Sequence, residues 1–158
     1  MRMAPDDIID LLKLAPHPEG GYFRESYRAE GKVPRIDRNH STAIYYLLEG
    51  DDCSKLHRIA SDEMWHFYMG DPLVVVEIDS DGVVSETTLG TNLKSGQTLQ
   101  HVVPAKRWFG AYLPDGSEYA LVGCTVAPGF DFDDFEMGER DALLKRYPDA
   151  KPAIERLT

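Results

Sequence analysis

A histidine and a glutamate lie close together in the sequence between two glycines, and their side chains could carry out acid–base chemistry. The segment runs from Gly50 through His57 and Glu63 to Gly70. Imidazole titrates near neutral pH, and a neighbouring carboxylate can orient the ring and raise its pKa. Such a pair can take a proton from a bound molecule and return it. We therefore expect His57 to be a base and Glu63 to orient it.

Aromatic side chains near this pair could form the walls of a ligand pocket. Side chains alternate along a strand, so Glu63, Trp65 and Phe67 share one face. Trp108 and Tyr112 likewise share a face of a later strand. The two tryptophans, with Phe67 beside them, offer flat surfaces for a sugar ring or a base, and Tyr112 could donate a proton. The alternative is that these rings belong to the core and that the histidine–glutamate pair only satisfies its own buried polarity.

A turn before the first strand supplies three more candidates for ligand contacts. Gly20 and Gly21 suit a chain reversal. Glu19, Tyr22 and Arg24 flank this reversal, and we expect them to reach over the pocket. The alternative is a plain turn without a functional role.

Most of the chain has the pattern of β-strands. Short β-branched and aromatic segments alternate with Gly, Pro, Asn or Asp. The expected strands are 22–28, 42–48, 64–69, 73–78, 83–89, 101–103, 107–113 and 119–126. Asp81 and Gly82 together are typical of a hairpin turn. Many short strands with little helix between them predict an all-β sandwich or barrel, and the mouth of a barrel is a common ligand site.

Helices are expected only near the two ends. Residues 5–14 begin with a proline and two aspartates and carry an apolar stripe. Residues 138–147 form the second helix, which a proline stops. We expect a single domain over residues 1–158, with a barrel core at about 22–137.

The charge balance argues against nucleic acid and membrane partners. The chain has 17 Lys and Arg against 27 Asp and Glu, a formal net charge of −10, which repels phosphate backbones and anionic lipid. No apolar run has membrane-spanning length, and the N-terminal residues carry charges where a signal peptide needs an apolar core. Cys53 and Cys124 are expected to be reduced thiols. These features predict a cytoplasmic protein whose partner is a small-molecule ligand.

The segment between the two glycines resembles the first motif of the cupin superfamily. That motif has a glycine, His-x-His, a glutamate and a final glycine. The matching residues here are Gly50, His57, Glu63 and Gly70, with one extra residue after Gly50. Ile59 stands where the second histidine belongs.

The second cupin motif is matched less well, but other stretches resemble one branch of the superfamily. Pro104 fits the motif, whereas Trp108 and Tyr112 replace its histidine and asparagine. The chain is similar to the cupin-five branch, a domain of unknown function. The stretches that carry this similarity are 17–23, 61–68, 108–111 and 127–130.

This resemblance implies a fold, an assembly and a set of metal ligands. The implied fold is the cupin double-stranded β-helix, a jelly-roll barrel, and the implied assembly is a homodimer. Metal-dependent cupins use three histidines and a glutamate, of which this chain keeps only His57 and Glu63. A catalytic transition metal usually has about three protein ligands. We therefore expect no metal cofactor; if a metal binds, these two residues would be among its ligands.

The resemblance also suggests a class of reaction. Cupin-fold nucleotide-sugar epimerases use a histidine base and a tyrosine acid to move protons next to a carbonyl. By analogy of fold, the leading hypothesis is a metal-independent epimerase, isomerase or lyase acting on a carbohydrate-like or nucleotide-sugar ligand. His57→Ala is then expected to abolish turnover and leave the fold intact. The alternatives are a non-catalytic module that binds or senses a small molecule, and a metal-dependent cupin enzyme.

Overall fold

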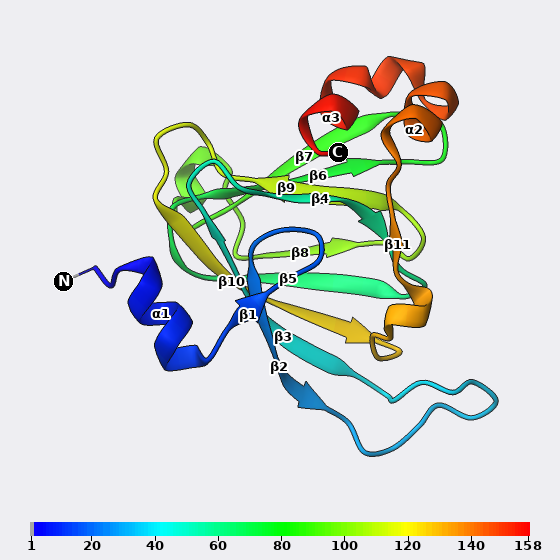
Figure 1. Ribbon diagram of the computed structural model, residues 1–158, viewed down its shortest axis with the longest axis horizontal. Helices are drawn as coiled ribbons and strands as arrows, with labels where there is room; N and C mark the ends of the chain where they lie inside the picture. The colour runs from blue at the N-terminus through cyan, green and yellow to red at the C-terminus, as the bar shows by residue number, and fades with distance from the viewer. Residues whose placement is uncertain (1) are drawn as a thin grey trace.

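The computed structural model describes residues 2–158, and all eleven strands in this range belong to two facing antiparallel sheets (Figure 1). The first sheet has the order β1 (Ala15–Pro16), β2 (Tyr22–Arg28), β3 (Thr42–Glu49), β10 (Tyr119–Ala127), β5 (Asp62–Gly70) and β8 (Gln100–Val103). The second has the order β11 (Glu136–Met137), β4 (Cys53–Arg58), β9 (Trp108–Tyr112), β6 (Leu73–Ile78) and β7 (Val84–Leu89). This arrangement confirms the all-β jelly-roll barrel expected from the sequence.

The helices lie outside the barrel (Figure 1). They are α1 (Pro5–Leu12), α2 (Arg140–Arg146) and α3 (Lys151–Arg156), with single 3-10 turns η1 (Leu93–Ser95), η2 (Phe132–Asp134) and η3 (Pro148–Ala150). Helix α1 buries Ile8 against Leu47 and Leu121 of the first sheet. Helices α2 and α3 cover the outer face of the second sheet. Both sheets are thus partly covered on the side that faces away from the barrel interior.

Strand β6 is apolar along almost its whole length because it is buried on both faces. Leu73 and Val75 point between the sheets into the barrel core. Val74, Val76 and Ile78 point the other way, beneath α2 and α3. Each buried aliphatic side chain contributes roughly 1.5–3 kcal/mol relative to an exposed one, so this strand joins the barrel core to the C-terminal helices. The next strand follows through the expected hairpin turn, in which the Gly82 backbone N–H donates to the Asp79 carbonyl at 3.0 Å.

Several elements differ from the sequence prediction. The bounds of β2 and β6 agree with it, and the first helix ends at Leu12 rather than at residue 14. Helix α2 begins at Arg140 rather than 138, because the Glu139 side chain caps it by accepting the Ala142 backbone N–H at 3.1 Å. Strands β1, β4 and β11 and helix α3 were not predicted. Two of these elements matter for the site, because β4 carries His57 and α3 covers the outer face of β9.

Within residues 2–158 every helix is too short or too polar to cross a membrane. The homodimer, the cytoplasmic location and the single-domain organisation stay predictions.

Candidate active site

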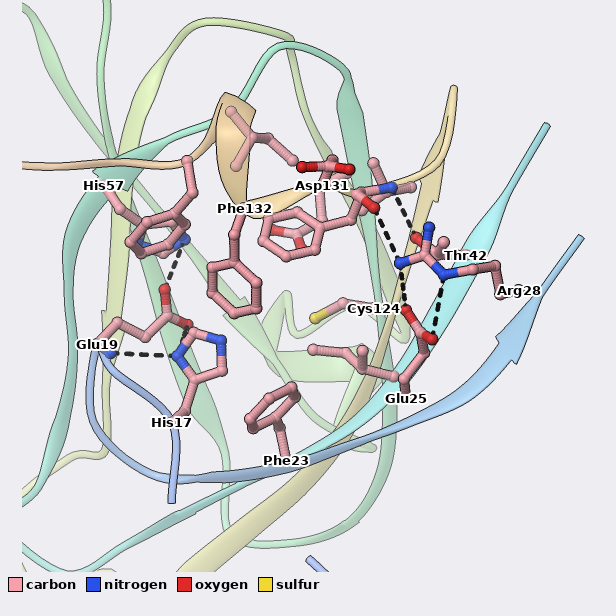
Figure 2. Close-up of a pocket in the computed structure, with 16 residues that line it drawn as sticks. His17, Glu19, Phe23, Glu25, Arg28, Thr42, His57, Cys124, Asp131 and Phe132 are labelled. Atoms are coloured by element: carbon pink, nitrogen blue, oxygen red, sulfur yellow. Dashed lines mark hydrogen bonds and ion pairs between the residues drawn. The ribbon is translucent and has the colours of Figure 1, made fainter. Parts of the chain in front are cut away.

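The two sheets enclose a cavity of about 260 Å³ (Figure 2). Its walls come from β2, β3, β5 and β10 of the first sheet, from β4 of the second, from the turn that precedes β2, and from residues 130–135. Eight of its sixteen lining residues are apolar or cysteine and eight are polar. A mixed cavity of this size suits a small metabolite.

A buried ion pair joins two walls of the cavity. The Nε2 atom of His57, on β4, lies 2.9 Å from Oε2 of Glu19, in the turn before β2 (Figure 2). The other ring nitrogen, Nδ1, lies 2.7 Å from the carbonyl oxygen of Lys55. A carbonyl can only accept, so Nδ1 carries a proton, and Nε2 needs a second one to face a carboxylate. The geometry therefore favours an imidazolium paired with a carboxylate.

Electrostatics in the cavity favour the charged forms of this pair. Burial disfavours the imidazolium, but the Glu19 carboxylate, together with Glu63 and the Lys55 carbonyl, outweighs burial and raises the pKa of His57. Burial likewise opposes the carboxylate, and His57 outweighs it and lowers the pKa of Glu19. The ring of Phe135 stacks on the imidazole with centroids 5.3 Å apart, and Phe109 packs at 4.1 Å. These four contacts hold His57 in place, and neither ring nitrogen of the imidazolium has a free lone pair.

A second histidine in the cavity is neutral. The Glu19 backbone N–H donates to Nδ1 of His17 at 3.1 Å, so the ring proton lies on Nε2. Burial lowers the pKa of His17, although Glu19 opposes the shift. Figure 2 shows the second ring nitrogen of His17 turned toward the middle of the cavity. It can donate a hydrogen bond to a ligand without bringing a charge.

Glu63, on β5, titrates close to neutral pH. Burial raises its pKa to about 7; His57 opposes the shift and the Glu19 carboxylate adds to it. Its side chain lines the cavity, and the residue is only 9% exposed. Within residues 2–158 it forms no ion pair at 4 Å or less. A carboxyl group with such a pKa can take up and release a proton at physiological pH.

The expected partner of His57 was Glu63, but the ion pair forms with Glu19. The cause is the turn before β2, which folds against β4: the Lys55 backbone N–H donates to the Glu19 carbonyl at 2.9 Å. Tyr46 holds the next residue by donating its hydroxyl to the Gly20 carbonyl at 2.7 Å. The structure thus brings three predicted residues, His57, Glu63 and Glu19, into one cavity.

Gly20 is required for this close approach. Its φ is +106°, and a Cβ there would lie 2.2 Å from the carbonyl oxygen of Cys53. We expect Gly20→Ala to lower the free energy of unfolding by about 2–3 kcal/mol, from backbone strain together with the clash. Gly116 is the matched control, since its φ is +81° but a Cβ at this position would meet no neighbouring group within 4 Å. Gly116→Ala is expected to lower the free energy of unfolding by about 1–2 kcal/mol. Urea denaturation measures both, and equal losses would contradict the clash.

Trp108 and Tyr112 lie outside the cavity, which corrects their expected roles. Along β9 it is Phe109 that points into the barrel interior, whereas Trp108 and Tyr112 pack with the C-terminal helices. The guanidinium of Arg156, on the unpredicted helix α3, lies 3.6 Å from the centre of the Tyr112 ring. The guanidinium of Arg58 covers Trp108 at 4.6 Å. Helix α3 makes the outer face of β9 a packing surface rather than a ligand wall.

The other predicted ligand contacts also lie elsewhere. Trp65 is 1% exposed in the barrel core, and Phe67 packs against that core. Tyr22 packs against the apolar residues beneath helix α1, on the outer face of the first sheet. The Arg24 guanidinium lies over the Tyr45 ring at 5.5 Å. Side chains alternate along β2, so Tyr22 and Arg24 point away from the cavity, and their neighbours Phe23 and Glu25 line it instead.

A segment outside the strands and helices expected from the sequence forms one wall of the cavity. We call residues 130–135 the aromatic strap, because Phe130, Phe132 and Phe135 all line the cavity. Arg38 holds the strap through Asp134, with Nε–Oδ2 and Nη2–Oδ1 distances of 2.6 and 2.8 Å. The recurrence of phenylalanine among the aspartates of this stretch is the signal that could have identified it.

The donor groups of the site do not fit the metal centre of metal-dependent cupins. Ile59 and Trp108 occupy two of the four ligand positions, and both ring nitrogens of His57 are engaged. In the part of the chain that the structure describes, no three His, Cys, Asp or Glu side chains are arranged to hold a metal ion.

Comparisons with known proteins agree with this architecture. The family model described as cupin superfamily (DUF985) matches residues 6–138. The uncharacterized protein YML079W of Saccharomyces cerevisiae is 30% identical, over 94% of this chain and 82% of its own. Protein SO0799 of Shewanella oneidensis is 38% identical with a TM-score of 0.94, covering 99% of this chain and 98% of its own. A hypothetical protein from Leishmania major is 33% identical with a TM-score of 0.93, covering 99% of each chain.

A more distant structure shows the fold alone. Oxalate decarboxylase of Bacillus subtilis is 14% identical with a TM-score of 0.58, covering 90% of this chain and 36% of its own. The family match spans most of the chain, and the yeast and Leishmania relatives named above are described as uncharacterized and hypothetical proteins. The protein belongs to the cupin superfamily, in the family of unknown function DUF985 (Cupin_5).

Proposed function

We propose that this protein is a metal-independent isomerase that moves a proton next to the carbonyl group of a small molecule. The observation that carries the proposal is Glu63, a buried carboxyl group with a pKa of about 7 that faces a ligand-sized cavity. The best general base has a pKa near the working pH. Clusters of groups with shifted pKa values in a cavity are typical of catalytic sites, although structural ion pairs also produce them.

In this proposal Glu63 replaces His57 as the base. The imidazole is expected to stay protonated because Glu19 faces its Nε2 and the Lys55 carbonyl accepts from its Nδ1. The Glu63 carboxylate takes a proton from the carbon next to the carbonyl, and the electrons of that C–H bond move onto the carbonyl oxygen. The Nε2–H of His17 donates to this oxygen, and the nearby imidazolium favours its negative charge.

The proposed reaction is isomerisation rather than two-base epimerisation. One base returns the proton to the same face of the substrate, either to the original carbon or to the former carbonyl carbon. The second outcome also moves the proton of a hydroxyl group on the original carbon to the former carbonyl oxygen. Epimerisation with two groups needs an acid on the opposite face, and Tyr112, which was expected to supply it, donates to Glu86 at 3.2 Å outside the cavity. The aromatic strap would keep water from the intermediate.

The titration of Glu63 tests the basis of this proposal. With ¹³C-labelled glutamate, we expect one side-chain carboxyl carbon to titrate near pH 7, and we expect that signal to vanish in Glu63→Gln. Glu86→Gln, the same change on β7 outside the cavity, should leave it unchanged. Titration of the Glu63 carbon near 4.5, the ordinary value for glutamate, would remove the foundation of the proposal.

A non-catalytic binding module is the second candidate. It is favoured by the apolar half of the cavity lining and by the aromatic strap, which suit retention of a ligand as well as its conversion. A ligand recovered unchanged, with no deuterium incorporated from D₂O, would support this candidate over the isomerase.

A further inference from the structure

The cavity is lined by more acidic side chains than basic ones. Four carboxyl groups line it, those of Glu19, Glu25, Glu63 and Asp131. The cations that line it are Arg28 and, in its protonated form, His57. The whole chain carries a formal net charge of −10. The electrostatic potential in the cavity is therefore expected to favour a positive ligand.

Both cations are already engaged within the protein. Arg28 donates from Nε and Nη2 to the Glu25 carboxylate and from Nη2 to the Phe130 carbonyl, at 2.5 to 3.2 Å (Figure 2). Its Nη1 donates to the Asn39 side chain at 3.0 Å. His57 is committed to Glu19 and to a backbone carbonyl. A phosphate, a carboxylate or the diphosphate of a nucleotide sugar would meet no free cation among the lining residues that the structure describes.

The polar atoms that remain available are mainly acceptors. The Glu19 carboxylate already pairs with His57, and the Glu25 carboxylate already pairs with Arg28. The carboxyl group of Glu63 has no ion-pair partner in residues 2–158. A buried carboxylate without a donor is costly, so a ligand that brings N–H donors would satisfy the Glu63 carboxylate.

The apolar part of the wall also suits a cation. Phe23, Phe130, Phe132 and Phe135 line the cavity opposite or beside these carboxyl groups. Phenylalanine rings attract ammonium groups through their negative faces, most strongly where water is excluded.

From these contacts we propose that the substrate of this cavity is a small organic cation, a protonated amine whose ammonium lies between Glu63 and Glu19 within the phenylalanine walls. The inference rests on the proposed function, since it takes the same cavity to be the substrate site. It replaces the nucleotide sugar considered from the sequence with a carbonyl compound that also carries an amine.

Three probes of matched shape test the charge of the ligand by isothermal titration calorimetry: cyclohexylammonium, cyclohexanol and cyclohexanecarboxylate. We expect cyclohexylammonium to bind at least tenfold more tightly than cyclohexanol, and the carboxylate to show no saturable binding. Equal or tighter binding of the carboxylate, or no saturable binding of any probe, would overturn the inference.

Two variants locate the ammonium. Glu63→Gln is expected to weaken binding of cyclohexylammonium at least tenfold and to change binding of cyclohexanol less than twofold. Glu86→Gln should change neither, and an unchanged ammonium affinity in Glu63→Gln would contradict the assigned position.

Binding is also expected to depend on pH through Glu63. The groups near it that carry or could carry charge are His57 on β4, Glu19 in the turn before β2 and Cys124 on β10. The ammonium favours the Glu63 carboxylate, so affinity should rise between pH 6 and 8 in the wild type and should change much less in Glu63→Gln. A wild-type affinity that falls over this range would count against the proposed contact.

These measurements separate the ligand class from the reaction. Tight ammonium binding without proton exchange at carbon would leave the inference standing and refute the isomerase. Proton exchange that requires Glu63, together with preferred binding of the carboxylate, would support the isomerase and refute the cationic ligand.

Discussion

Glu63→Gln is expected to slow catalysed proton exchange at carbon at least 100-fold. Glutamine has nearly the shape of glutamate but cannot accept the proton, and a positioned general base typically contributes about 10²–10⁴-fold. The measurement is deuterium incorporation from D₂O into dihydroxyacetone and aminoacetone, followed by proton NMR. Aminoacetone, the amine of the two, should exchange faster.

The pH profile identifies the base independently of the substitution. Glu63 must be ionised to accept a proton, and its pKa is raised to about 7. The wild-type rate should therefore rise from pH 5 and level off above about pH 8. Glu86→Gln, outside the cavity, should keep both the rate and the profile. A profile that is flat through pH 7, or a Glu63→Gln variant that exchanges at the wild-type rate, would show that another group is the base.

A folding defect is not expected to explain the loss of proton exchange in Glu63→Gln. Glu63 has a folded-state pKa above its ordinary value of 4.5, so its ionisation destabilises the folded state as pH rises through 7. Glutamine removes that ionisation, and Glu63→Gln should be at least as stable as the wild type at pH 8. Absence of catalysed exchange in the wild type with both compounds would favour the binding module instead.

The parts of the fold that follow from local pattern were predictable. The apolar run of β6 and the Asp81-Gly82 turn are local features, and the resemblance to the first cupin motif identified His57 and Glu63, which both line the cavity. The similarity of the chain to the cupin-five family supplied the topology, which alternation alone does not determine.

The parts of the site that depend on packing between distant segments were not predictable. Alternation shows that Trp108 and Tyr112 share a face of β9, but it does not show which face points into the barrel. Helix α3 covers the face that carries these two residues, so the opposite face points inward. The partner of His57 comes from a turn that lies far from it in sequence and reaches it only because Gly20 allows close backbone contact. The aromatic strap is held by residues far from it in sequence, by Arg38 through Asp134 and by Arg28 and Thr42 through the Phe130 backbone.

His57→Leu is expected to lower the free energy of unfolding by about 3–5 kcal/mol. The expectation from the sequence was that His57 could be removed without harm to the fold, but its ion pair with Glu19 changes this. Removing one partner of a buried pair leaves the other charge unpaired in a medium of low dielectric constant, which costs about that much. Both side chains are at most 7% exposed, so water cannot easily replace the lost partner.

The adjacent residue on β4 provides a matched control. Arg58 pairs with Glu136 at 2.7 Å, but these side chains are 40% and 54% exposed. Exposed pairs contribute about 0–1 kcal/mol, so Glu136→Gln should have little effect. Urea denaturation of both variants compares a buried and an exposed ion pair held by neighbouring residues of one strand.

The pH dependence and a double variant separate the lost pair from lost packing. The pKa of Glu19 is lowered from 4.5 and that of His57 is raised from 6.5, so the contribution of the pair is fully present between those two values. It is lost as pH falls through the folded-state pKa of Glu19 or rises through that of His57. The deficit of His57→Leu should thus be largest near pH 5.5. Adding Glu19→Met removes the unpaired carboxylate and should restore at least half of the lost stability; a double variant less stable than His57→Leu would assign the loss to packing instead.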